Sequence, residues 1–192
     1  YDYTVPFEIV PDEINSNGYK FIINKNENNA LTASAQKINT GSKDSKIALL
    51  CASLVGDKDA EFVINGRGVK AKVNSCFERF ARWDLYDFGE TAYIKKGKIA
   101  YEATHCHKNG KDEIAKSMYF YIVEFDVPKN STVILPNDSD IVILAACSLH
   151  DGKATLAAPV YDEIQNNRPF TFKMSKKEKA EYILGKCVWN LR

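Results

Sequence analysis

The clearest pattern in this chain is the alternation of apolar and polar residues, which is typical of β-strands. Two stretches, 99–107 and 119–127, alternate in this way on either side of a polar loop at 108–112. In the first stretch Tyr101, His105 and His107 share one face, because successive side chains of a strand point in opposite directions. We therefore expect an antiparallel pair of strands, the first of which ends in two histidines on the same side.

Further strand-like stretches recur along the chain with turn residues between them. The continuous apolar run at 47–55 predicts a strand that is buried on both faces. The dipeptide Asn65-Gly66 between two short strand-like stretches predicts a hairpin. The remaining strand candidates are 19–23, 31–38, 132–135, 141–148 and 153–158. No long amphipathic helix interrupts this series, so the sequence predicts an all-β, antiparallel β-sandwich of jelly-roll-like type.

The character of the sequence changes after Pro169. Ser175 and Glu178 fit the first and last positions of a capping box, and Gly185 fits the position after a helix end. We expect a short C-terminal helix at about 176–184. The predicted organisation is an N-terminal segment (residues 1–18) that leads into the fold, a β-sandwich domain (19–165) and a C-terminal helical appendage (166–192).

Composition narrows the possible partners and the compartment. The 192 residues carry a formal net charge of +1 and 45% hydrophobic residues, so we expect no nucleic-acid partner. No apolar run approaches the roughly 18 residues that span a bilayer, so we expect no membrane partner. Five cysteines, with no C-x-x-C pair, favour free thiols and a cytoplasmic location. Because the sequence starts at Tyr1 rather than at a methionine, we expect a fragment of a longer protein.

Aromatic and polar residues suited to carbohydrate lie close together in the sequence. The candidate binding residues are Trp83, Asp84, Tyr101, His105 and His107. An indole face can stack on a pyranose ring, a carboxylate accepts hydrogen bonds from hydroxyls, and an imidazole can donate them. The alternative is structural: Trp83 would fill the core beneath a loop, Asp84 would cap a turn, and the histidines would bond to loops at the sheet end.

Neither catalysis nor a metal site is predicted. His105 and His107 could share a metal ion, but nothing in the sequence fixes a third ligand. Asp84, Glu102 and His150 are the nearest candidates by type, and Glu102 is on the opposite face of the strand. Cys106 points away from both histidines, so neither can act as its base. There is also no G-x-S-x-G, P-loop or G-x-G-x-x-G motif, so we predict no catalytic residue, no metal and no cofactor.

Residues 19–162 resemble the C-terminal β-rich region of bacterial glycoside hydrolases related to the family 38 α-mannosidases. The stretches that carry the resemblance, in chain order, are 29–38, 47–57, the hairpin at 62–73, Phe80-Ala81-Arg82-Trp83-Asp84, 93–101, Thr104-His105-Cys106-His107, 119–127, Leu135-Pro136-Asn137-Asp138, 141–146 and Pro159-Val160-Tyr161-Asp162. The chain departs from the family where Ala81-Arg82 replaces Gly-Gln and where Leu85-Tyr86 replaces Asn-Arg.

The resemblance implies a division of labour within a longer protein. In that family the nucleophilic aspartate and the zinc ion belong to an N-terminal barrel, which this chain lacks. The resemblance therefore implies a non-catalytic accessory domain that scaffolds the catalytic domain and contacts carbohydrate. The alternatives are a free-standing carbohydrate-binding module, a small metal-dependent enzyme that uses His105 and His107, and a purely structural packing domain.

Overall fold

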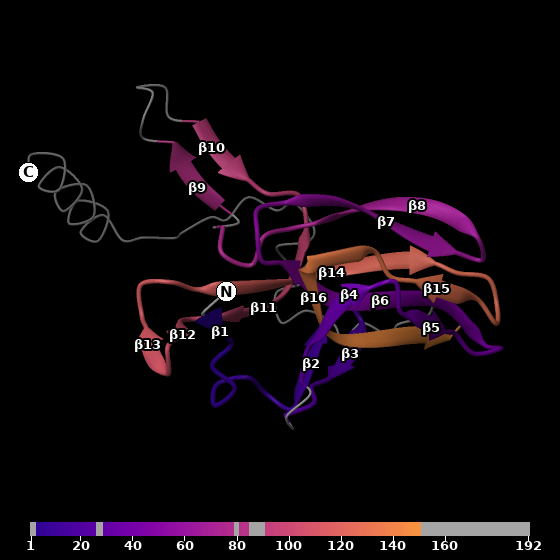
Figure 1. Ribbon diagram of the computed structural model, residues 1–192, viewed down its shortest axis with the longest axis horizontal. Helices are drawn as coiled ribbons and strands as arrows, with labels where there is room; N and C mark the ends of the chain where they lie inside the picture. Colours follow the sequence, from indigo (N-terminus) through magenta and orange to yellow (C-terminus); the bar gives the residue numbers. More distant parts are fainter. Residues whose placement is uncertain (1–2, 26–28, 79–80, 85–90, 151–192) are drawn as a thin grey trace, which may run out of the picture. The chain divides into compact units, whose positions relative to one another are not determined.

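The computed structural model describes residues 3–25, 29–78, 81–84 and 91–150, and for 81–84, 91–94 and His150 it describes the backbone only. Within these ranges every regular element is a β-strand (Figure 1). None of the described residues belongs to a helix long and apolar enough to cross a bilayer. The predicted helix at 176–184 lies outside the described residues and stays a prediction. The predicted domain boundaries also stay predictions.

The larger of the two main sheets has five antiparallel strands. In spatial order they are β11 (Lys98–Ala103), β14 (Met118–Asp126), β6 (Asp44–Ser53), β16 (Asn137–His150) and β4 (Leu31–Ser34). The predicted pairing of 99–107 with 119–127 is confirmed for β11 and β14, although a bulge between Ile99 and Tyr101 shifts its register and β11 ends at Ala103. The alternation that the sequence suggested is therefore broken at both places.

The smaller main sheet has four antiparallel strands. In spatial order they are β5 (Lys37–Asn39), β15 (Thr132–Ile134), β7 (Lys58–Ile64) and β8 (Arg67–Val73). The predicted hairpin is confirmed as β7–β8, with its turn at Asn65 and Gly66, whose φ angles are 49° and 81°. Positive φ at both central residues defines a type I′ turn, and Asn-Gly is its favoured sequence.

The two main sheets face each other across a buried apolar core. Ile47, Leu49 and Cys51 of β6 point into this core, and Phe62 and Phe125 meet there with ring centroids 4.8 Å apart. Because the inward residues of β6 alternate with a second buried set, both faces of this strand are covered. The prediction that 47–55 forms a strand buried on both faces is confirmed for β6.

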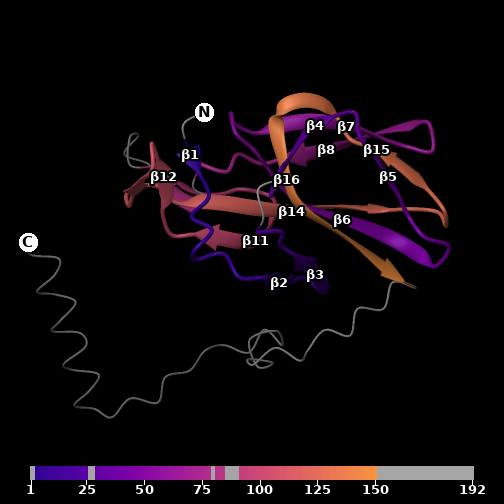
Figure 2. The ribbon, with the colours of Figure 1, turned by 60° about the horizontal axis from the view of Figure 1, so that its bottom comes forward.

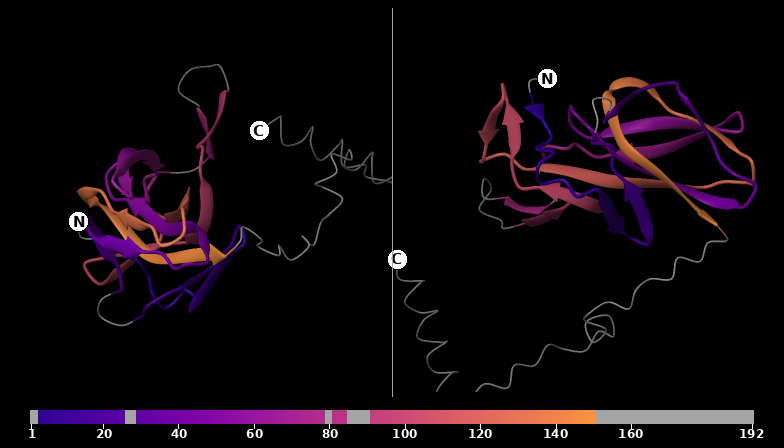
Figure 3. Two further views of the ribbon diagram at one scale, coloured as in Figure 1. Left: turned by 90° about the vertical axis from the view of Figure 1, so that its right-hand side faces the viewer. Right: turned by 90° about the horizontal axis from the view of Figure 1, so that it is seen from below.

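The second face of the five-stranded sheet is covered by the start of the chain. Ala48 and Leu50 pack there against Val10, Ile14 and Phe21. The covering layer includes the hairpin of β2 (Glu13–Ser16) and β3 (Tyr19–Ile22). Figure 3 shows the layers from two further directions. The N-terminal segment thus contributes strands and buried side chains to the body of the domain.

Two small sheets complete the described fold. One combines β1 (Tyr3–Thr4), β12 (Cys106–Lys108) and β13 (Lys111–Glu113); the other pairs β9 (Ala81–Asp84) with β10 (Thr91–Ile94). The sheet β1–β12–β13 lies at one end of the five-stranded sheet, and β5 and β15 lie at the other (Figures 1 and 2). The described residues confirm the all-β, antiparallel sandwich that the sequence predicts.

Candidate functional site

The two predicted histidines come together at the small sheet β1–β12–β13. Their ring centroids are 5.6 Å apart. His107 belongs to β12, whereas His105 lies in the break between β11 and β12. The predicted proximity of the two imidazoles is confirmed, but a separate short hairpin positions them rather than the end of one long strand.

A tight turn sets the register of that hairpin. Asn109 and Gly110 have φ angles of 52° and 71°, again the type I′ turn that Asn-Gly favours. This turn makes Lys108 and Lys111 partners and places Asp112 directly opposite His107. Directly opposed residues of an antiparallel pair have neighbouring side chains. The two-residue turn therefore brings the carboxylate of Asp112 next to the imidazole of His107.

The N-terminal segment supplies a second carboxylate, from Glu8. Thr4 of β1 pairs with His107, Pro6 and Val10 are buried, and the Tyr101 hydroxyl donates a hydrogen bond of 3.0 Å to the Ile9 carbonyl. These contacts hold the segment on both sides of Glu8. We call Glu8, His105, His107 and Asp112 the polar cluster.

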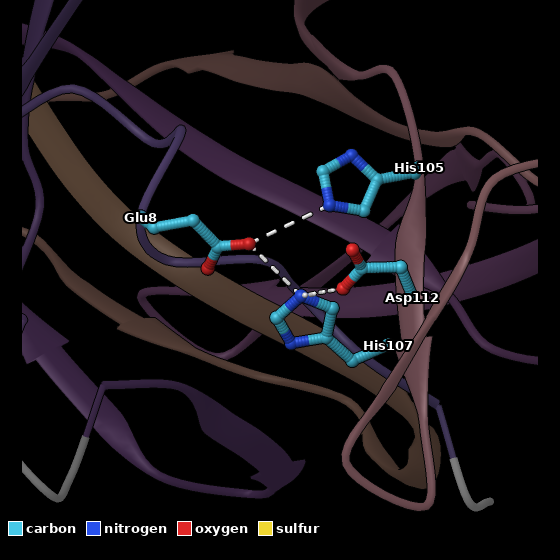
Figure 4. Close-up of side chains that lie close together, drawn as sticks. All are labelled: Glu8, His105, His107 and Asp112. Atoms are coloured by element: carbon cyan, nitrogen blue, oxygen red, sulfur yellow. Dashed lines mark ion pairs between the residues drawn. The ribbon is translucent and has the colours of Figure 1, made fainter.

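The polar cluster is compact (Figure 4). Glu8 Oε1 lies 2.9 Å from His107 Nε2 and 3.5 Å from His105 Nε2, and Asp112 Oδ1 lies 3.2 Å from His107 Nε2. One potential ligand atom from each of the four residues lies within 4.8 Å of the other three. The side chains of Glu8 and Asp112 are 54% and 65% exposed, so the cluster opens to solvent on its carboxylate side.

The His107 Nε2 atom stands out within the cluster. It is shielded from solvent and forms a directed hydrogen bond with no group in the described part of the chain. Its two carboxylate neighbours, Glu8 Oε1 and Asp112 Oδ1, lie 2.9 Å and 3.2 Å away and form ion pairs with the ring when it is protonated. His105 differs, because its second ring nitrogen, Nδ1, lies 3.4 Å from the Thr104 hydroxyl.

Electrostatics around the cluster favour an ionised Glu8. A hydrogen bond from its own backbone N–H, together with His107 and His105, lowers the pKa of the Glu8 carboxyl. Burial raises the pKa of the Tyr101 hydroxyl, and the negative charge of Glu8 adds to this effect. Tyr101 thus stays a neutral donor, as its bond to the Ile9 carbonyl requires.

The structure brings three of the five predicted carbohydrate-binding residues together. His105 and His107 lie in the cluster, and Tyr101 stands beside it with its hydroxyl already bonded. Trp83 and Asp84 belong to β9, whose side chains lie outside the described residues, so their part in a binding site stays a prediction. Cys106 is buried on the core side of β12, and burial raises the pKa of its thiol.

Sequence reasoning missed both carboxylates of the cluster. It considered Asp84, Glu102 and His150 as the third ligand of a metal, whereas the structure supplies Glu8 and Asp112. Asp112 could have been found, because an Asn-Gly type I′ turn at 109–110 fixes its place opposite His107. Glu8 left no such signal, since it lies about 100 residues away along the chain and reaches the histidines through tertiary packing alone.

A family model for the AziU2-like beta-sandwich domain matches residues 1–152. The chain belongs to this family. The matched range of the AziU2-like domain contains all four residues of the polar cluster. The family confirms the β-sandwich part of the resemblance. No curated protein matches the chain.

Proposed function

We propose that this AziU2-like domain is a non-catalytic accessory domain that contacts carbohydrate through the polar cluster. The observation that carries the proposal is the gathering of two exposed carboxylates and two partly buried imidazoles at one end of the sandwich. Carboxylates accept hydrogen bonds from sugar hydroxyls, and imidazoles can donate or accept them. The resemblance to accessory regions of α-mannosidase-like glycoside hydrolases supplies the substrate class and the partner, a catalytic domain of the parent protein.

The burial of the cysteine thiols supports the accessory role. Cys51 and Cys76 are buried as free thiols, and burial raises the pKa of each to about 12. A thiol of this kind acts as a packing group rather than as a nucleophile. The same free thiols support our proposal of a reducing, cytoplasmic compartment.

Titration of the 192-residue chain with mannose-containing oligosaccharides tests the proposal. We expect saturable binding by calorimetry or by chemical-shift changes that map to the polar cluster. Glu8→Gln keeps the shape of the side chain but removes its charge, so it should weaken binding by on the order of tenfold or more. Trp83→Ala should weaken binding as well if the indole forms the sugar platform.

Glu13→Gln is a matched control, because Glu13 also lies in the N-terminal segment but pairs with Lys20. This variant should bind like the original chain. The accessory role further predicts that the chain alone hydrolyses no aryl α-mannoside. The proposal is wrong if the chain binds no oligosaccharide, if Glu8→Gln and Glu13→Gln bind equally well, or if the purified chain turns over a mannoside.

A further inference from the structure

Three of the six ligand-atom separations in the polar cluster are close to the edge of a metal coordination polyhedron. For a tetrahedral zinc ion with bonds of 2.0–2.1 Å, two neighbouring ligand atoms are about 3.3 Å apart. The three measured separations that link Glu8, His105, His107 and Asp112 are 2.9, 3.2 and 3.5 Å. All four potential ligand atoms lie within 4.8 Å of one another, so a tetrahedral ion would bind once the wider pairs drew together.

The unpaired nitrogen of His107 supplies an independent indication. A buried imidazole nitrogen normally has a hydrogen-bond partner, because burial without one costs free energy. His107 Nε2 makes no directed hydrogen bond among the described residues, although carboxylate oxygens of Glu8 and Asp112 lie 2.9 Å and 3.2 Å from it. A cation bound between these atoms would satisfy the nitrogen and both oxygens together.

The chemistry of the donors selects the kind of ion. Two imidazole nitrogens with two carboxylate oxygens favour zinc and its neighbours over calcium or magnesium, which prefer oxygen ligands alone. The Thr104 hydroxyl lies 3.4 Å from the other ring nitrogen of His105, Nδ1. A hydrogen bond at that nitrogen leaves Nε2, which faces Glu8, free to bind a metal.

The fold also holds the four residues in place before any ion binds. The turn at Asn109 and Gly110 fixes Asp112 against His107, and the pairing of Thr4 with His107 fixes the start of the N-terminal segment. The hydrogen bond from Tyr101 to the Ile9 carbonyl fixes the segment just beyond Glu8. Pre-positioned ligands lower the ordering cost of binding.

We propose that Glu8, His105, His107 and Asp112 bind one divalent transition-metal ion, with zinc preferred, and that this ion fastens the N-terminal segment to the β12–β13 hairpin. Four protein ligands close the coordination sphere, which is typical of structural zinc sites rather than catalytic ones. The ion would cross-link two parts of the chain that lie about 100 residues apart. The inference uses the same cluster as the proposed function but does not depend on carbohydrate binding.

Zinc titration of the full chain tests the site. After dialysis against a chelator, we expect the chain to take up one zinc ion per molecule and to unfold at a higher temperature with zinc than without it. Loss of a group that hydrogen-bonds to a metal ligand costs about 10–100-fold in metal affinity, so loss of a ligand itself in Glu8→Gln or His107→Gln should cost at least about 100-fold. The control Glu13→Gln should bind zinc like the original chain.

Cobalt substitution identifies the ligands by spectroscopy. We expect the visible bands of tetrahedral Co²⁺ without the near-ultraviolet band that a cysteine thiolate ligand would add. The thiolate band, zinc binding that Glu8→Gln and His107→Gln leave unchanged, or less than one equivalent of zinc at saturation would each overturn the proposal. Urea unfolding of both metal-free variants shows whether they are folded. A variant that fails to fold is thereby distinguished from one that has lost only a metal ligand.

Oligosaccharide binding with and without chelator separates the two proposals. Zinc binding without any oligosaccharide binding supports the metal site and refutes the carbohydrate function. Oligosaccharide binding that depends on Glu8, in a chain that takes up no zinc, supports the carbohydrate function and refutes the metal site.

Discussion

Replacing Asp57 with asparagine tests the most buried ion pair in the described part of the chain. The side chain of Lys95 is only 3% exposed, and its Nζ lies 2.5 Å from Asp57 Oδ1 and 2.5 Å from Glu78 Oε2. Asp57 Oδ1 also accepts a hydrogen bond of 2.9 Å from the Ser75 backbone N–H. The variant keeps the shape of the side chain and removes its charge.

The expected loss of stability follows from the burial of the lysine. Removing one partner of a fully buried ion pair costs about 3–5 kcal/mol, because the other charge is left uncompensated. Here the side chain of Asp57 is 22% exposed, and Glu78, whose side chain is 54% exposed, remains as a second acceptor. Both features reduce the cost, so we expect Asp57→Asn to lower the free energy of unfolding by about 2 kcal/mol.

The dependence on pH gives a second measurable consequence. Burial alone would raise the pKa of the Asp57 carboxyl, but the hydrogen bond from Lys95, the Ser75 amide and the positive charge of Lys95 outweigh it and lower this pKa. The unfolded chain then binds the proton more readily than the folded chain. The stabilisation is therefore present above the ordinary value of 3.8 and is lost as the pH falls through the lowered pKa. The difference between the original chain and Asp57→Asn should shrink in that range.

Urea unfolding, followed by circular dichroism, measures this difference. Asp59→Asn is the control, because Asp59 is exposed on the neighbouring strand β7. Adding Lys95→Met to Asp57→Asn should recover part of the loss, since it removes the unpaired charge. A loss no larger than that of the control, or a double variant less stable than Asp57→Asn, would show that the pair does not act as described.

Three further substitutions or reactions test other parts of the fold. Phe62→Ala removes a fully buried ring from between the main sheets and should lower the free energy of unfolding in urea by about 3–5 kcal/mol. Phe62→Leu is the conservative control, and a loss below about 1 kcal/mol for Phe62→Ala would contradict the described core. Tyr101→Phe removes the hydrogen bond to the Ile9 carbonyl, so it should lower the free energy of unfolding by about 0.5–1.5 kcal/mol and speed proteolysis near residue 9. Unchanged stability and proteolysis would show that this hydrogen bond does not hold the N-terminal segment. Burial raises the pKa of Cys51 to about 12, so a thiol reagent at pH 8 should modify the half-buried Cys147 and reach Cys51 only in urea, as mass spectrometry of the labelled peptides can check.

The local rules of the sequence accounted for much of the fold. The alternation at 119–127 and the apolar run at 47–55 correspond to two adjacent central strands, β14 and β6. The dipeptide Asn65-Gly66 predicted a hairpin that the structure contains. The same dipeptide at 17–18 and 109–110 also makes turns with positive φ at both residues.

The sequence by itself determined the fold class, because that depends on side-chain periodicity over a few residues. It also predicted that His105 and His107 lie close together, although a short hairpin rather than the end of one long strand positions them. Only the tertiary structure decided which carboxylates join His105 and His107. Glu8 reaches them because the N-terminal segment must cover the second face of the five-stranded sheet, whose apolar side chains would otherwise face water. No local pattern encodes that contact, since it depends on how distant parts of the chain bury a shared surface.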